Sequence, residues 1–142
     1  FSYNEIDEAL NDFPDLRIST RENEGHFYRL FYDSRLVIAT TNYTAFLQSF
    51  FVNKPTLLLW DPEYFTIRDS AKEYYDLLHD AGILYYSPEL CAKKVNEIHQ
   101  NPMEWWMTAE VQAAKNEYCE HFCRITGNME GELAEVINEM RK

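Results

Sequence analysis

The first hundred residues alternate between short continuous apolar runs and longer segments with apolar residues at helical spacing. A continuous apolar run without polar alternation is typical of a strand whose two faces are both covered, as in a parallel sheet. We predict four strands, at residues 15–20 ("DLRIST"), 35–40 ("RLVIAT"), 55–60 ("PTLLLW") and 83–86 ("ILYY").

The segments between these runs predict helices, at residues 5–13, 26–34 and 43–52 and beyond Thr66 and Ser87. Thr66 with Asp69 three residues on has the pattern of a capping box, and Gly82 follows the apolar stripe of that helix. Ser87, Pro88 and Glu89 are typical of a helix start. Strands that alternate with helices pair in parallel through right-handed crossovers. The fold class expected is therefore α/β, a Rossmann-like parallel sheet of about four strands with flanking helices and a helical C-terminal extension.

The last third of the chain changes to an all-helical pattern. Asn101-Pro102 predicts the start of a short helix, and a long helix and a final helix around Leu133 follow. The long helix carries one apolar face, formed by Met107, Val111, Ala114, Tyr118 and Phe122. We expect residues 1–100 to form the α/β domain and residues 101–142 a helical extension that packs on it or on a second lobe. Because the chain begins at Phe1, we interpret it as a piece of a longer protein.

The charge balance excludes some partners. With 13 basic and 24 acidic residues, the chain has a net charge of −11, whereas nucleic acids and anionic membranes are normally met by a basic face. A nucleotide is not excluded, since the backbone amides at a helix start can hold a phosphate. No apolar run approaches the roughly 20 residues that a membrane span needs.

The three cysteines have no disulfide-framework spacing and favour a reducing, cytoplasmic setting. Cys119 and Cys123 stand one helical turn apart, as two metal ligands would. His121 lies between them and points off that face, so buried thiols are the preferred interpretation. We predict no metal site and no cofactor.

Polar side chains follow two of the predicted strands at the edge where an open parallel sheet binds ligands. After residues 35–40 comes a cluster that ends where a helix begins; it consists of Thr40, Thr41, Asn42, Tyr43 and Thr44. After residues 55–60 comes a second group: Asp61, Glu63, Tyr64 and Arg68. Hydroxyl groups and free helix-start amides could hold a diphosphate there. The alternative is that Thr41 or Asn42 merely caps the helix.

Residues from about Leu36 to Arg124 carry a series of short motifs in a fixed order. They are T-x-N-x-T, N-x-P-T, W-D-P, R-x-S-A-K, A-G-I, S-P-E, W-W and E-V-Q. In this order the chain resembles the second half of a two-lobed glycosyltransferase of the GT-B type. More narrowly, it is similar to a family of transferases of bacterial surface-carbohydrate biosynthesis. The first thirty residues carry little of the resemblance.

The resemblance implies a nucleotide-sugar donor bound by this half, with the acceptor and the chemical base on a missing N-terminal lobe. Thr40, Asn42 and Thr44 would line the diphosphate. Gln48 stands where related sequences tend to have a glutamate that bonds the donor ribose, and a neutral amide does so more weakly.

Asp61, Tyr64 and Arg68 would lie near the donor sugar or the cleft between the lobes. The alternatives are that Asp61 caps the turn at Pro62 and that Arg68 pairs with an acid on its own helix, such as Asp69 or Glu73.

Two further features stay open. His26 could meet a donor phosphate or the acceptor, or be a surface residue. Trp105 and Trp106 point about 100° apart on a helix, so at least one is expected to be an anchor and not part of a sugar-stacking surface. The long helix resembles one that crosses to the first lobe in these enzymes, and its apolar face could mediate a homodimer.

We therefore favour the donor-binding half of a glycosyltransferase, inactive by itself, that acts on a bacterial surface-polysaccharide precursor. The alternative is a non-catalytic nucleotide-binding or interaction module of the same fold, which Gln48 favours. Sugar-nucleotide epimerisation would need a carboxylate and histidine cluster, and none is evident here.

Overall fold

The computed structural model of this protein describes residues 3–16, 31–124 and 131. The chain divides into two compact units, residues 1–34 and 35–142. In the first unit, helix α1 spans Tyr3–Asp12, and residues 31–33 are helical as predicted. His26 and the predicted final helix around Leu133 lie outside the described residues.

The second unit is built on a parallel sheet of three strands in the order β1-β2-β3. They span Val37–Ala39, Thr56–Leu59 and Leu84–Tyr85. Three of the four predicted strands are thus present. The structure does not show a fourth: the segment predicted at 15–20 is described only at Asp15 and Leu16, which are not in a strand.

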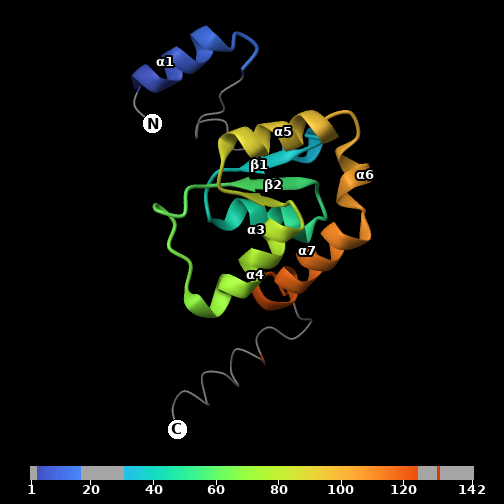
Figure 1. Ribbon diagram of the computed structural model, residues 1–142. Coiled ribbons are helices and arrows are strands. Elements are labelled where there is room, and N and C mark those ends of the chain that lie inside the picture. Colours follow the sequence, from blue (N-terminus) through green and yellow to red (C-terminus); the bar gives the residue numbers. More distant parts are fainter. Residues whose placement is uncertain (1–2, 17–30, 125–130, 132–142) are drawn as a thin grey trace. The chain divides into compact units, whose positions relative to one another are not determined.

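Helices cover both faces of this sheet (Figure 1). On one face lie α3 (Thr44–Phe51), α4 (Asp69–Asp80) and α7 (Ala109–Phe122). On the other face lies α5 (Pro88–Ile98), and the short α6 (Pro102–Trp106) leads from α5 to α7. Among the described residues, no helix is both long and apolar enough to cross a membrane.

The central strand β2 explains why its run is apolar throughout. Leu57 and Leu58 are both fully buried, but successive side chains of a strand point to opposite faces. Leu57 packs in a cluster with Cys91 and Ile98 from α5. Leu58 packs in the larger cluster on the side of α3, α4 and α7. A strand covered on both faces needs apolar residues at every position, as the sequence pattern predicted.

Helix ends follow the predicted signals at three of four places, since α6 begins at Pro102 as predicted. Gly82 has φ of 69°, and the amides of Gly82 and Ile83 donate to the carbonyls of His79 and Leu78, which ends α4 in a Schellman motif. Ser87 caps α5 by accepting from the amide of Leu90. The prediction that Thr66 opens α4 is wrong. The helix begins at Asp69 after an extended Arg68, because Ile67 turns inward to pack against the core.

We expect Ser87→Ala to lower the free energy of unfolding by about 1 kcal/mol, because α5 would lose its cap. The same hydroxyl donates to Glu89 at 2.7 Å, and this bond holds the pKa of Glu89 below its ordinary value of 4.5. A carboxylate whose pKa is lowered by folding stabilises the fold above its unfolded pKa and loses this effect as the pH falls through the folded value. The variant should therefore raise the pKa of Glu89, measured by NMR titration; an unchanged pKa would contradict this account.

Candidate functional site

The two predicted polar clusters lie at one edge of the sheet. Strands β1 and β2 pair in parallel and adjacent to each other, so both of their carboxyl ends point the same way. The loops that follow them touch, because the rings of Tyr43 and Phe65 pack edge to face with centroids 6.2 Å apart. The structure therefore brings Thr40–Thr44 and the loop after β2 together, as the sequence predicted.

The first turn of α3 has no side-chain cap. The residue at the cap position is Tyr43, which is extended and makes no capping hydrogen bond. The interpretation that Thr41 or Asn42 caps this helix is therefore wrong. Within the described part of the chain, the hydroxyls of Thr40, Thr41 and Thr44 have no hydrogen-bond partner either. This edge thus presents uncommitted N–H and O–H donors at the positive end of a helix dipole.

Asn42 is held by a hydrogen bond from Tyr75, which in turn accepts one from Tyr118. The hydroxyl of Tyr75, on α4, donates to Oδ1 of Asn42 at 2.8 Å. The hydroxyl of Tyr118, on α7, donates to that of Tyr75 at 2.9 Å. Burial, with this hydrogen bond, raises the pKa of Tyr118 far above its ordinary value, so it stays a donor. Because Oδ1 is occupied, the amide N–H₂ group of Asn42 is the part of the side chain left to meet a ligand.

We expect Tyr75→Phe to lower the free energy of unfolding by about 1 to 2 kcal/mol, because it removes an acceptor from Tyr118 and a donor from Asn42 in a buried place. Tyr64→Phe is a matched control, since Tyr64 is 82% exposed. Urea unfolding compares the two variants. An equally small effect of both would show that this hydrogen-bonded chain does not hold the turn.

The other predicted site residues are exposed at this edge or beside it. Asp61 caps its own turn, since Oδ1 accepts from the amide of Glu63 at 2.8 Å. Gln48 and Arg68 are exposed, and neither side chain has a hydrogen-bond or ion-pair partner among the residues described. The pairing of Arg68 with Asp69 or Glu73 is thus absent, and no residue described in the structure occupies its guanidinium, which could bind an anion.

A buried donor lies at the same edge. Trp60, the first residue after β2, is 3% exposed, and its indole N–H has no acceptor within the described residues. Its ring packs between Phe46 of α3 and Phe65 of the loop. A buried N–H without a partner is unfavourable, and such a group often bonds a water or a ligand.

The three cysteines differ in burial, and the interpretation of buried thiols holds for Cys91 but not for Cys119 and Cys123. Cys91 is buried, and burial raises the pKa of its thiol. Cys119 and Cys123 are half-buried against the larger core cluster, while His121 turns away to Tyr74, with ring centroids 4.1 Å apart. In the described ranges, no three histidine, cysteine or acidic side chains gather as metal ligands would.

Sequence reasoning missed Asn53, the residue that ties α3 to α6 and α7. Its φ is 52°, and its Oδ1 accepts from Trp106 Nε1 and from Lys115 Nζ, both at 3.0 Å. Trp106 is fully buried and is therefore the anchor of the tryptophan pair. An asparagine just beyond an apolar helix stripe, as in the motif N-x-P-T, is the signal that could have identified this left-handed position.

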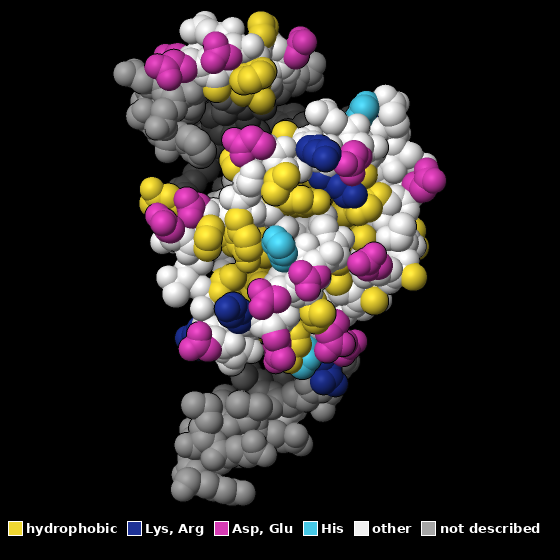
Figure 2. Space-filling model, viewed as in Figure 1, with side chains coloured by type: hydrophobic (Ala, Val, Ile, Leu, Met, Phe, Trp, Pro, Cys, Tyr) yellow, Lys and Arg dark blue, Asp and Glu magenta, His cyan; other side chains and the backbone are white. Residues whose placement is uncertain are grey.

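Acidic side chains are spread over the face of the 35–124 region shown in Figure 2, with few lysines and arginines among them. A ligand diphosphate at the carboxyl edge would therefore depend on Arg68 and on backbone and side-chain dipoles rather than on a broad basic surface.

A family model described as "LIC12162 family transferase" matches residues 1–137 of the 142 in this chain. No curated protein and no solved structure matches the chain.

Proposed function

Because the chain belongs to the LIC12162 family of transferases, we propose that it is the donor-binding half of a glycosyltransferase-like enzyme of the GT-B type. It would move a sugar or a phosphate-linked unit from a nucleotide donor to a bacterial surface-polysaccharide precursor in the cytoplasm. The parallel sheet covered by helices on both faces supports a Rossmann-like lobe of this kind.

The observation that supports the proposal is the uncapped start of α3 beside three threonine hydroxyls that have no partner among the described residues. The amides of the first turn and the hydroxyls of Thr40, Thr41 and Thr44 would donate to the diphosphate. Asn42, fixed through Oδ1 by Tyr75, would donate from its N–H₂ group. A helix start binds an anion best when no side chain of its own occupies the amides.

The remaining predicted residues take supporting parts in this proposal. Arg68 would meet the diphosphate with its free guanidinium, and Gln48 would bond the donor ribose. Asp61 and Tyr64 would lie towards the donor sugar. Catalysis would consist of stabilising the nucleotide diphosphate as it leaves, with the base supplied by a second lobe. No metal and no cofactor has a part in this proposal.

We expect this chain to bind one of UDP, CDP and GDP in calorimetric titration, and Thr44→Ala to weaken that binding about fivefold to tenfold, the loss of one hydrogen bond to a charged group. Thr108→Ala is the matched control, because this exposed threonine lies between α6 and α7, at the opposite end of the sheet from the proposed site. Equal weakening by both variants, or a Thr44→Ala variant that binds as tightly as the parent, would contradict the placement of the diphosphate.

The second candidate is a nucleotide-binding module without transferase activity. Gln48 supports it, because an amide in place of a carboxylate bonds a ribose hydroxyl more weakly. Gln48→Glu distinguishes the two functions in the full-length protein. Increased transfer in the variant would favour the enzyme, and tighter nucleotide binding without transfer would favour the module.

A further inference from the structure

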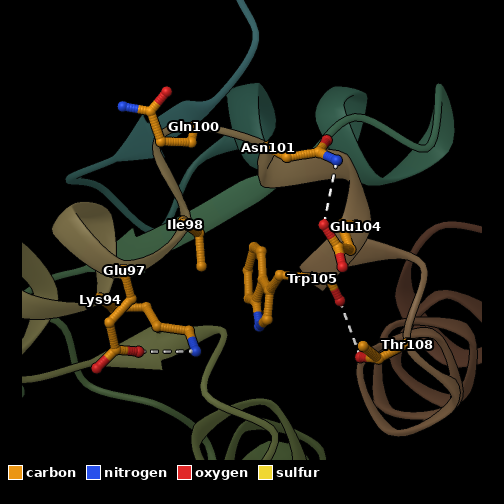
Figure 3. Close-up of a pocket in the computed structure, with 8 residues that line it drawn as sticks. All are labelled: Lys94, Glu97, Ile98, Gln100, Asn101, Glu104, Trp105 and Thr108. Atoms are coloured by element: carbon orange, nitrogen blue, oxygen red, sulfur yellow. Dashed lines mark hydrogen bonds and ion pairs between the residues drawn. The ribbon is translucent and has the colours of Figure 1, made fainter.

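A pocket of about 480 Å³ lies at the end of the sheet opposite to the candidate donor site. It is lined from the C-terminal turn of α5 by Lys94, Glu97 and Ile98, and from α6 and the residues before it by Asn101, Glu104 and Trp105. Figure 3 shows the indole of Trp105 standing at the centre of these side chains. The volume lies within the range of small-molecule sites in proteins.

Trp105 gives the pocket an aromatic surface, because its ring is only partly buried in the core. Its neighbour Trp106 is fully buried and bonded to Asn53, whereas Trp105 is half-buried and lines the pocket. The indole N–H of Trp105 has no acceptor among the described residues and is not enclosed. Lys94 Nζ lies 5.5 Å from the ring centroid. The ammonium of Lys94 thus lies over the ring, and the indole also packs against both core clusters, so only part of its surface is exposed to the pocket. A partly exposed indole is suited to a ligand that is apolar on one side and polar around its rim.

Polar groups with spare hydrogen-bonding capacity surround this ring. Lys94 lies 3.4 Å from Glu97, and Asn101 Nδ2 donates to Glu104 Oε2 at 3.2 Å (Figure 3). Each carboxylate keeps a second oxygen, and the ammonium and the amide keep further N–H groups. The lining therefore offers both donors and acceptors, as hydroxyl groups that both donate and accept require.

The charge of the pocket selects against anions. One lysine and two glutamates line it, in a chain of net charge −11. A phosphate, a nucleotide or an anionic lipid would meet two carboxylates. A neutral pyranose fits instead: its C–H groups pack on the electron-rich face of an indole, and its hydroxyls bond to carboxylates and amides.

We propose that the pocket at Trp105 is a second ligand site, which binds a neutral saccharide unit away from the donor edge. The proposal does not depend on the donor site at Thr40–Thr44. The side chains of Lys94, Glu97, Asn101 and Glu104 would bond the hydroxyls, and the exposed part of Trp105 would supply the stacking surface.

The test is a titration followed by NMR of the indole N–H signals, which distinguish Trp60, Trp105 and Trp106. The probes are glucose, galactose, mannose, N-acetylglucosamine and N-acetylgalactosamine, with adenosine as a stacking ligand of another class. We expect at least one sugar to move the Trp105 signal saturably with a Kd in the range of about 1 to 10 mM, usual for so small a ligand.

Trp105→Ala should weaken binding at least about tenfold. The double variant Asn101→Ala/Glu104→Ala, which keeps the indole, should weaken it by a similar factor and covers the case that Trp105→Ala does not fold. Met103→Ala, also on α6 but outside the lining, and Thr44→Ala should leave it unchanged. No saturable shift with any sugar, a stronger response to adenosine than to every sugar, or equal binding by the double variant would overturn the proposal.

Discussion

Tyr118→Ala should lower the free energy of unfolding by about 3 to 5 kcal/mol, the usual cost of removing a buried aromatic ring. Tyr118 is 2% exposed, and its ring packs against Phe46 and Phe50 of α3 and against Tyr75 of α4. The variant would leave a cavity where α7 meets both helices. It would also remove the hydroxyl that supports Tyr75 under the turn at Asn42.

Tyr118→Phe is the matched variant, because it keeps the ring and removes only the hydroxyl. We expect it to cost about 1 kcal/mol. Urea unfolding of the two variants separates packing from hydrogen bonding. A loss below 1 kcal/mol for Tyr118→Ala would show that α7 is not part of the core of this unit.

Asn53→Ala should lower the free energy of unfolding by about 3 kcal/mol. Alanine at φ of 52° is strained by about 1 kcal/mol, and Lys115 would lose its acceptor. Trp106 Nε1 would lose Oδ1 but keep the backbone carbonyl of Asn53, to which it also donates at 3.1 Å. Lys115 is only 8% exposed, and Asn53 is its hydrogen-bond partner in the described part of the chain. An unpaired buried cation is costly, which makes this the second large effect.

Companion variants separate the contributions of Asn53. Asn53→Gly avoids the backbone strain of the alanine variant but still lacks the side-chain acceptor. Asn53→Asp keeps an acceptor for both donors and should be close to the parent in stability. Combining Asn53→Ala with Lys115→Met should cost less than Asn53→Ala alone. Additive effects of Asn53→Ala and Lys115→Met would contradict the claim that these side chains act together.

The parts of the fold that could be predicted are those with a local cause. The strands at Val37–Ala39 and Thr56–Leu59 follow from continuous apolar runs, because a covered strand must be apolar at every position. Gly82 and Ser87 mark helix ends by their own backbone and side-chain chemistry. The predicted helix start at Thr66 is wrong because the neighbouring Ile67 packs against the core, and no local sequence pattern shows this contact.

The location of the candidate site could be predicted from the sequence, but the contacts between its side chains could not. Parallel strands bring Thr40–Thr44 and Asp61 to one edge, so the sequence was enough to locate them. Asn42 was expected to cap α3 or face a ligand, whereas its Oδ1 bonds Tyr75, which is 33 residues further along the chain. That bond depends on how α4 crosses the turn. The sequence pattern indicates Tyr118 only as a member of the apolar face of the long helix.

The burial of side chains on α7 also depends on contacts with residues far away in the sequence. Its predicted apolar face is buried at Val111, Ala114 and Tyr118, but Met107 and Phe122 at its two ends are exposed. Lys115 lies on the same buried side of α7, where its ammonium group donates a hydrogen bond to Oδ1 of Asn53. From the sequence alone, a lysine beside the apolar face of a helix is expected to face solvent. The burial of Lys115 depends on its bond to Asn53, which lies 62 residues away in the sequence.

The most direct test of the central claim is to locate the nucleotide on the backbone by ¹H–¹⁵N NMR titration with UDP, CDP and GDP. The account predicts that one of them shifts the amide signals of Thr44, Ala45 and Phe46, at the start of α3. The amides of Glu110 and Val111 should stay in place, because they lie in the first turn of α7, another helix start without a side-chain cap, next to α6 at the opposite end of the sheet. Shifts confined to the pocket at Trp105, or equal shifts at Glu110 and Val111, would contradict a diphosphate site at the carboxyl edge of the sheet.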